Sequence, residues 1–178
     1  MKNVVIISSS PRRDGNSETL CREFLRGVES VGHKGEIICL RDYNLKYCNG
    51  CYTCAKLGNC VFNDGMNEIG EKLLKADAIV LATPVYFYSM SGQLKVFIDR
   101  LIPYYRKIKA DIYLIATMYD NEKEMMDSTF DAIRGATRDC FINCEEKGVI
   151  YGLRLLEKED ASRREDLKAK AFAMGMSV

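Results

Sequence analysis

Five short runs of apolar, largely β-branched residues recur along the chain and are separated by longer amphipathic stretches. The runs occupy residues 4–7, 36–40, 78–83, 112–117 and 149–155. Within each run the apolar side chains are nearly continuous instead of alternating with polar ones, which is typical of strands buried on both faces. Because the stretches between them are long enough for crossover helices, the pattern predicts a parallel five-stranded sheet with helices on both sides.

The intervening stretches predict five helices. They are expected at about residues 16–32, 65–75, 92–101, 122–147 and 161–173, the fourth with an interruption at Gly135 as an option. Asn16 and Ser17 are both frequent N-cap residues, so the first helix should begin there. No repeat or linker breaks this alternation, which predicts a single domain over residues 1–178. The exception is residues 43–64, a segment without clear periodicity that holds four of the eight cysteines.

The composition of the chain argues against several classes of function. The 26 Lys and Arg residues against 25 Asp and Glu residues give a formal net charge of +1, so neither nucleic-acid binding nor attachment to a membrane is expected. The apolar run at residues 4–7 is too short for the core of a signal peptide, and we therefore expect a cytoplasmic protein. Cysteines stay reduced in that compartment, which points to metal binding or redox chemistry. The single histidine, His33, excludes a metal site built from several imidazoles.

The loop after the first strand, SSSPRRDGNSETL at residues 8–20, has the features of a phosphate site. Neither a G-x-G-x-x-G fingerprint nor a Walker A motif occurs in the chain. The loop instead places serines and Arg12 or Arg13 before a helix start, whose N–H groups suit a phosphate monoester. In an open sheet of order 2-1-3-4-5 this loop lies at the switch point where ligands bind. The alternative is a polar turn that only caps the helix.

The third strand runs into a second candidate loop, TPVYFYSMSGQLKVFIDR at residues 83–100. Pro84 fixes the backbone and lacks an N–H group, while the residues after it offer main-chain donors beside aromatic surfaces. Such a loop can hold a flat heterocycle. The alternative is an aromatic patch that belongs to the core.

Four cysteines follow the spacing C-x₂-C-x₂-C-x₅-C; they are Cys48, Cys51, Cys54 and Cys60. Thiolates are soft ligands, and three at successive intervals of three residues wrap around one compact centre, as in iron–sulfur ligation. Structural zinc sites usually pair two C-x₂₋₄-C units across a longer separation, so the compact spacing favours a cluster over zinc. A patch of free thiols without any metal is the third option.

The two loops and the cysteine segment CNGCYTCAKLGNCVFNDGM together resemble the flavodoxin-like NADPH-dependent FMN reductase family, and within it the iron–sulfur flavoproteins most closely. The resemblance covers residues 4–100, and GVIYGL at residues 148–153 is similar to the last strand of the family. It implies a flavodoxin-like, doubly wound sheet of order 2-1-3-4-5. It also implies FMN as cofactor, NAD(P)H as electron donor and a [4Fe–4S] cluster held by the four cysteines.

The family's site residues carry over to three loops. The resemblance implies that the first loop holds the phosphate and the second loop holds the isoalloxazine. A third loop, after the fourth strand, makes further contacts with the flavin. These residues are Ser9, Ser10, Arg12, Asn16 and Ser17; Pro84, Val85, Tyr86 and Phe87; and Met118, Tyr119 and Asp120. It further implies a homodimer or homotetramer, for which Pro103, Tyr104 and Tyr105 offer a surface unless they close the core.

The function implied is that of an FMN-dependent NAD(P)H oxidoreductase, which passes electrons from a nicotinamide to an acceptor directly or through the cluster. The cofactor carries this chemistry, so no general acid or base is nominated. Two alternatives remain open. One is an electron carrier between partner proteins, and the other is a flavin-binding module that senses redox state through its thiols.

Overall fold

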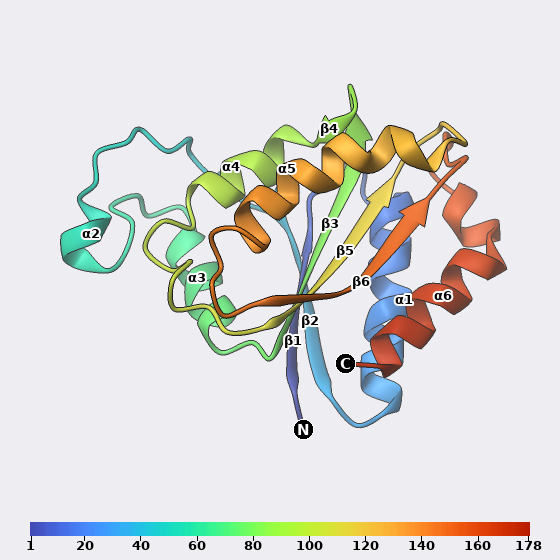
Figure 1. Ribbon diagram of the computed structural model, residues 1–178, viewed down its shortest axis with the longest axis horizontal. Coiled ribbons are helices and arrows are strands. Elements are labelled where there is room, and N and C mark those ends of the chain that lie inside the picture. The colour runs from blue at the N-terminus through green and yellow to red at the C-terminus, as the bar shows by residue number, and fades with distance from the viewer.

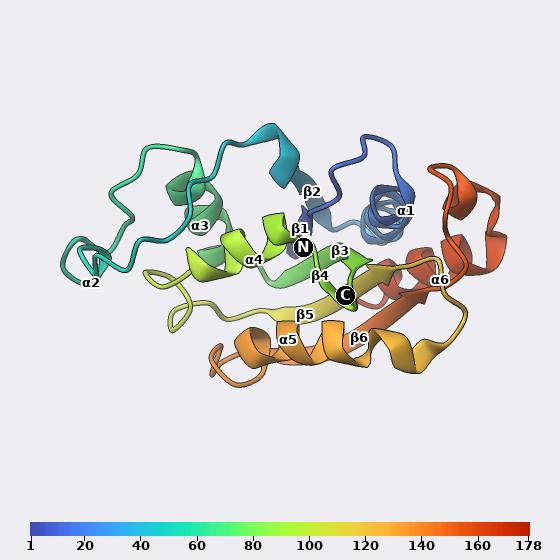
Figure 2. The same cartoon turned by 90° about the horizontal axis from the view of Figure 1, so that it is seen from above.

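A computed structural model describes residues 1–178 as three layers, with a sheet between two layers of helices (Figures 1 and 2). The strands are β1 (Asn3–Ser8), β2 (Lys34–Cys39), β3 (Ala78–Tyr86), β4 (Ser89–Met90), β5 (Asp111–Thr117) and β6 (Glu145–Gly152). The helices are α1 (Asn16–Ser30), α2 (Cys54–Leu57), α3 (Met66–Leu74), α4 (Gly92–Asp99), α5 (Asp127–Thr137) and α6 (Glu165–Met176). Short 3₁₀ helices lie at Leu40–Asp42, Lys123–Met126 and Asp160–Arg163.

The five long strands are parallel and lie in the order β2-β1-β3-β5-β6. Counting only these strands, this is the predicted order 2-1-3-4-5. The sixth strand, β4, was not expected; it pairs antiparallel with the end of β3 and closes a hairpin beyond the sheet. The predicted doubly wound α/β fold is therefore confirmed.

Alternate residues of each strand point to opposite layers, which explains why the apolar runs are continuous. Val4 and Ile6 of β1 belong to a core cluster with α1 and α6, whereas Val5 and Ile7 belong to one with α3, α4 and α5. Every one of these four side chains is buried. A strand covered on both faces needs apolar residues at both its odd and its even positions.

Helices α1 and α6 lie side by side on one face of the sheet (Figure 1). They meet through two glycines. A Cβ atom at Gly27 would overlap the carbonyl oxygen of Phe172 in α6, and one at Gly175 would overlap that of Phe24 in α1. The missing side chains therefore allow the two backbones to approach.

The predicted helix at residues 122–147 was too long. Helix α5 ends at Thr137, and a turn follows in which Phe141 is buried. Cys140 and Cys144, which were expected on this helix, lie in the turn. The edge strand β6 then starts at Glu145 with three exposed residues, so its first half carries no apolar signal. Gly135 does not interrupt α5.

The last helix starts at Glu165, four residues later than the sequence indicates, because residues 160–163 form a 3₁₀ turn. The cysteine segment contains one regular element, the single turn α2, and extends away from the sheet (Figures 1 and 2). Tyr104, considered for a subunit surface, is only 1% exposed and closes the core. None of the helices is both long and apolar enough to cross a bilayer.

Candidate functional site

A pocket of about 210 Å³ opens at the carboxyl ends of β1, β3 and β5. It lies where ligands bind in open α/β sheets, beside the strand at which the sheet order reverses. Nine of the twelve residues expected to contact the flavin line it. They are Ser10, Arg12, Asn16, Ser17, Pro84, Val85, Tyr86, Met118 and Tyr119. The parallel sheet thus brings together three loops. About 70 residues separate the first from the second along the chain, and about 30 separate the second from the third.

The N-terminus of α1 faces this pocket. The first backbone bond of the helix runs from the Thr19 N–H to the Gly15 carbonyl, so the N–H groups of Asn16 and Ser17 have no backbone acceptor. The N-cap is Gly15, and no side chain caps the helix, in contrast to the expectation for Asn16 or Ser17. Free N–H groups and the helix dipole together favour an anion at this position.

Hydroxyl groups complete the polar wall next to the helix start. Ser17 Oγ lies 2.7 Å from Thr117 Oγ1, and both groups are buried. Ser10 Oγ accepts a bond of 3.3 Å from the Arg12 N–H. These hydroxyls can rotate to donate to a ligand, so the wall suits phosphate or sugar oxygens.

Residues 153–161 form a further wall that sequence reasoning missed. Leu155 and Leu156 line the pocket. Asn16 holds this segment with both ends of its carboxamide: Nδ2 donates to the Glu157 carbonyl at 2.8 Å, and Oδ1 accepts from the Ala161 N–H at 2.9 Å. Arg12 donates to the Leu156 carbonyl at 3.1 Å. The segment LLEKEDA carries no recognisable motif, so only the tertiary structure identifies it.

A buried ion pair lies beneath the first loop. The Glu18 carboxylate, with 6% of its side chain exposed, accepts from Arg41 at 2.7 Å. It also accepts from the Asp14 N–H and from Arg22. Asp14 adopts a left-handed backbone conformation, with φ of 57°. Glu18 lies in the first turn of α1 and thus fixes the backbone of the loop that precedes the helix.

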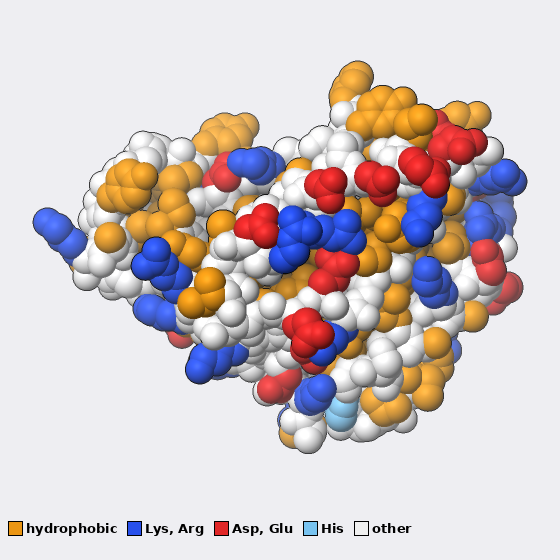
Figure 3. All heavy atoms as spheres, in the orientation of Figure 1, with side chains coloured by type: hydrophobic (Ala, Val, Ile, Leu, Met, Phe, Trp, Pro, Cys, Tyr) orange, Lys and Arg blue, Asp and Glu red, His pale blue; other side chains and the backbone are white.

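The second loop forms the β3–β4 hairpin, whose turn is made by two aromatic residues. Phe87 and Tyr88 have φ of 49° and 58°. These values belong to a two-residue hairpin turn that Asn and Gly usually occupy. Phe87 is fully exposed, whereas Pro84, Val85 and Tyr86 line the pocket. Apolar side chains gather on the surface above this hairpin (Figure 3).

Three predicted contact residues do not line the pocket. Ser9 is fully buried and donates to the Ala82 carbonyl at 2.8 Å, so its hydroxyl holds β1 to β3. Phe87 extends into solvent, and the Asp120 carboxylate accepts from the N–H groups of Asn121 and Glu122. The flavin-binding roles of all twelve residues remain predictions.

The four clustered cysteines line one small pocket of about 60 Å³. All four are free thiols, and Cys48 and Cys51 are exposed. Hydrogen bonds from the N–H and the hydroxyl of Thr53 lower the pKa of Cys51 below its ordinary value. No three His, Cys, Asp or Glu side chains are close enough together to bind a single metal ion.

Two sets of partly buried hydrogen bonds fasten this cysteine pocket to the sheet domain. Asn67 pairs with the backbone of Cys60 in both directions: Nδ2 donates to its carbonyl at 2.8 Å, and Oδ1 accepts from its N–H at 2.9 Å. The Tyr104 hydroxyl donates to the same Oδ1 at 2.7 Å, and burial raises the pKa of Tyr104 to about 12. Asn67 is therefore shared between the core and the cysteine segment.

The other end of the segment is held by Arg100. Its guanidinium donates to Asp64 at 2.9 Å and to the Lys46 carbonyl, while Asp64 accepts from the Lys46 N–H at 2.9 Å. The Arg100 and Asp64 side chains are only 1% and 5% exposed. Arg100 also lines the cysteine pocket, so one buried cation faces the thiols.

A family model for NADPH-dependent FMN reductase matches residues 2–120, which include the first two flavin-site loops and the cysteine segment. The chain belongs to the NADPH-dependent FMN reductase family. Several curated iron–sulfur flavoproteins are similar to it. One from Archaeoglobus fulgidus is 38% identical over 104 residues, which are 58% of this chain and 47% of that protein. One from Methanocaldococcus jannaschii is 43% identical over 100 residues, which are 56% of this chain and 52% of that protein.

The chain spans about half the length of the curated relatives that it matches. Solved structures cover more of it. The NAD(P)H:quinone oxidoreductase from Methanothermobacter marburgensis superposes with a TM-score of 0.74 over 99% of this chain and 96% of that one, at 18% identity. An azoreductase from Bacillus anthracis gives a TM-score of 0.69 over 99% of this chain and 98% of that one, at 12% identity. At these identities the structures support the fold of this FMN reductase family member and nothing more specific.

Proposed function

We propose that the protein is an FMN-dependent NAD(P)H oxidoreductase that passes electrons from a nicotinamide to an acceptor, with a [4Fe–4S] cluster as a second redox centre. The observation that carries this proposal is the gathering of nine predicted flavin contacts on one pocket. That pocket has free N–H groups at the start of α1 and two aromatic residues, Tyr86 and Tyr119, in its lining. These features suit a ligand with a phosphate at one end and a flat ring at the other.

Different residues of the pocket would bind different parts of FMN. The N–H groups of Asn16 and Ser17 would bind the phosphate, with Ser10 and Thr117 hydroxyls beside them. Backbone groups of Val85 and Tyr86 would orient the ring. Bound FMN would supply two-electron exchange with the nicotinamide and transfer of electrons onward. The protein contributes position and electrostatics, and none of these side chains needs to act as an acid or base.

The donor set also fits an iron–sulfur cluster. Four free thiols share one pocket, and a [4Fe–4S] cluster takes four cysteine ligands. A zinc site would need its ligands to converge on a single ion at about 2.3 Å. The compact spacing C-x₂-C-x₂-C-x₅-C favours a cluster over such a site. The buried Arg100 beside them would offset part of the negative charge of a cluster with four thiolates.

Anaerobic purification of the full chain, followed by visible spectroscopy and analysis of FMN, iron, sulfide and zinc, tests both cofactors. We expect one FMN and about four irons per chain. NADH and NADPH are then added separately under anaerobic conditions, and at least one should bleach the flavin bands. A flavin-loaded protein that neither nicotinamide reduces would contradict the oxidoreductase and support an electron carrier. A protein that binds no FMN would contradict both.

A further inference from the structure

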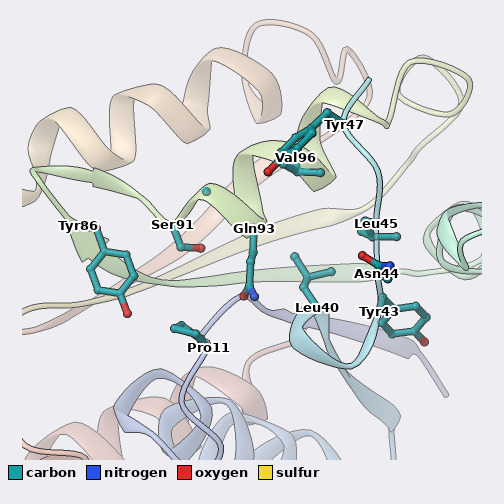
Figure 4. Close-up of a pocket in the computed structure, with 11 residues that line it drawn as sticks. Pro11, Leu40, Tyr43, Asn44, Leu45, Tyr47, Tyr86, Ser91, Gln93 and Val96 are labelled. Carbon is teal, nitrogen blue, oxygen red and sulfur yellow. The ribbon is translucent and has the colours of Figure 1, made fainter. Parts of the chain in front are cut away.

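The loop between β1 and α1 has little backbone support of its own. Within residues 10–15 the one bond between backbone groups runs from the Gly15 N–H to the Arg12 carbonyl, at 3.3 Å. The segment after β2 lies beside this loop, and Pro11 and Leu40 line the same cavity of about 450 Å³ (Figure 4). Arg41, which follows Leu40, therefore approaches the loop from a neighbouring strand.

Arg41 belongs to the buried ion pair with Glu18 that lies beneath the loop. The two side chains are at most 10% exposed, and their closest atoms are 2.7 Å apart. The same guanidinium donates a long hydrogen bond of 3.5 Å to the carbonyl of Ser10, a residue that lines the flavin pocket. Neither Arg41 nor Glu18 lines that pocket. Both can therefore act on a ligand only through the pocket wall or through their charge.

The ion pair places two opposite charges behind the site proposed for the phosphate. Glu18 directly follows Ser17, which lines the pocket and has a free N–H group. A phosphate is an anion, so the Glu18 carboxylate repels it and the Arg41 guanidinium attracts it. Because both groups are largely buried, solvent screens these forces less than it does at the surface. Arg41 thus cancels a charge that would otherwise oppose phosphate binding.

Four further charged side chains of this region are exposed. They form two pairs, Arg13 with Asp42 and Asp14 with Arg22. Exposed pairs of this kind contribute little, since water and salt screen them. Arg22 also lies 2.6 Å from Glu18, but its own side chain is half exposed. Arg41 is thus the buried cation behind the loop.

We propose that Arg41 is a specificity-determining residue for FMN, which neutralises Glu18 from behind the loop and so allows the start of α1 to accept a phosphate. Since it does not touch the ligand, Arg41 is a positioning residue and not a catalytic one. The proposal rests on the proposed function, because it takes this pocket to be the flavin site. Arg41 should therefore affect FMN but not riboflavin, which has the same ring and side chain without the phosphate.

Breaking the ion pair from either side separates a charge effect from a structural one. Arg41→Met leaves a bare carboxylate behind the phosphate, whereas Glu18→Gln leaves a bare guanidinium. A carboxamide at position 18 can still accept from the Asp14 N–H. We expect the preference for FMN over riboflavin, taken as the ratio of their Kd values, to fall about three- to tenfold in Arg41→Met and to rise by a similar factor in Glu18→Gln, as for one charge near a helix N-terminus.

Quenching of flavin fluorescence by the full-length protein, freed of flavin beforehand, measures both Kd values. Arg26→Met is the control, because Arg26 is exposed on the same helix and pairs with Glu23 away from the loop. A bare buried carboxylate destabilises a fold. Should Arg41→Met not fold, Glu18→Gln is compared with the double variant Glu18→Gln/Arg41→Met, which differs from it only in the Arg41 cation. The double variant should then show the lower preference for FMN.

An unchanged preference in Arg41→Met would overturn the proposal, as would a preference that falls in both single variants. Equal weakening of FMN and riboflavin would also overturn it, since Arg41 would then support only the shape of the pocket. An unmodified protein that binds both flavins equally well would show that the pocket does not recognise the phosphate, with the same consequence. Binding of neither flavin would contradict the proposed function itself and the inference with it.

Discussion

At the scale of single residues, Asn67 binds both the N–H and the carbonyl of Cys60 through its carboxamide, and its Oδ1 also accepts from the Tyr104 hydroxyl. Replacement by alanine leaves the Cys60 N–H and carbonyl without partners, and we expect the free energy of unfolding to fall by about 1–3 kcal/mol. Iron bound after anaerobic reconstitution should fall as well, because the last ligand of the segment is no longer held in place. FMN content should not change.

Asn63→Ala is the matched control for this prediction. Asn63 is exposed in the same segment and makes no hydrogen bond. Iron analysis, flavin absorbance and urea unfolding of both variants give the comparison. Full iron binding by Asn67→Ala would show that the cysteines organise themselves around the metal without this contact.

Asp64 links the stability of the same segment to pH. Burial raises the pKa of Asp64, but hydrogen bonds from Arg100 and from the Lys46 N–H outweigh this effect and lower it below its ordinary value of 3.8. A lowered pKa stabilises the folded state above that ordinary value, and the contribution is lost as the pH falls from there through the lowered pKa of the folded state. Asp64→Asn should therefore lower the free energy of unfolding near neutral pH by about 3–5 kcal/mol.

The difference between the unmodified protein and Asp64→Asn should shrink as the pH falls below the ordinary aspartate pKa of 3.8 and through the lowered pKa of the native carboxylate. Urea unfolding at several pH values measures it. Asp99→Asn, which removes an exposed pair with Lys95, should cost less than about 1 kcal/mol at any pH. A cost for Asp64→Asn that stays constant over this range would contradict the lowered pKa.

At the scale of elements, the contact between α1 and α6 depends on Gly175. An added methyl group would overlap the Phe24 carbonyl oxygen, so Gly175→Ala should push the helices apart and destabilise the protein by about 1–3 kcal/mol. Gly135→Ala should do the opposite. Gly135 lies inside α5 with open space around it, and alanine there should stabilise by about 0.4–1 kcal/mol. Thermal unfolding should move the two midpoints in opposite directions; equal shifts would contradict this.

The N-terminus of α1 offers a second test at this scale. Ser17→Ala removes a buried hydroxyl from the pocket wall but keeps the N–H group. We expect FMN to bind about 2- to 12-fold more weakly, which is the effect of one neutral hydrogen bond of about 0.5–1.5 kcal/mol. Quenching of FMN fluorescence by the apoprotein measures the Kd. Ser30→Ala, at the far end of the same helix, is the control, and unchanged affinity in both variants would place the phosphate elsewhere.

At the scale of the whole molecule, the sequence predicts what is buried better than what is exposed. Strands β1, β3 and β5 were found because apolar residues occupy both of their faces. The start of β6 at Glu145 was missed, since an edge strand can carry charged residues and still pair through its backbone. For the same reason the end of α5 was misplaced by ten residues.

The candidate site divides in a similar way. Its loops carry motifs, so Ser10, Arg12 and Tyr86 were placed correctly at one pocket. The wall at residues 153–161 depends on which segments the fold brings together. No local pattern marks it, and it became visible only with the tertiary structure.

The predicted dimer or tetramer is a property of the whole molecule, and we expect its subunits to meet at the β3–β4 hairpin. Phe87 is fully exposed, and its φ of 49° is one that a bulky side chain disfavours. Neither burial nor turn geometry explains an aromatic residue there, and we expect Phe87 to contact a second copy of the chain. Asparagine tolerates this backbone conformation. Phe87→Asn should therefore stabilise the isolated chain slightly and yet weaken its predicted dimer or tetramer.

Sedimentation velocity over a range of concentrations measures the association, and thermal unfolding at low concentration measures the stability of the single chain. We expect the sedimentation coefficient of Phe87→Asn to fall toward that of a monomer while the unfolding midpoint holds or rises. Ile142→Asn is the control, because Ile142 is exposed in the turn before β6, away from this hairpin. If Ile142→Asn dissociates the protein and Phe87→Asn does not, the subunit contact lies on the opposite side of the molecule.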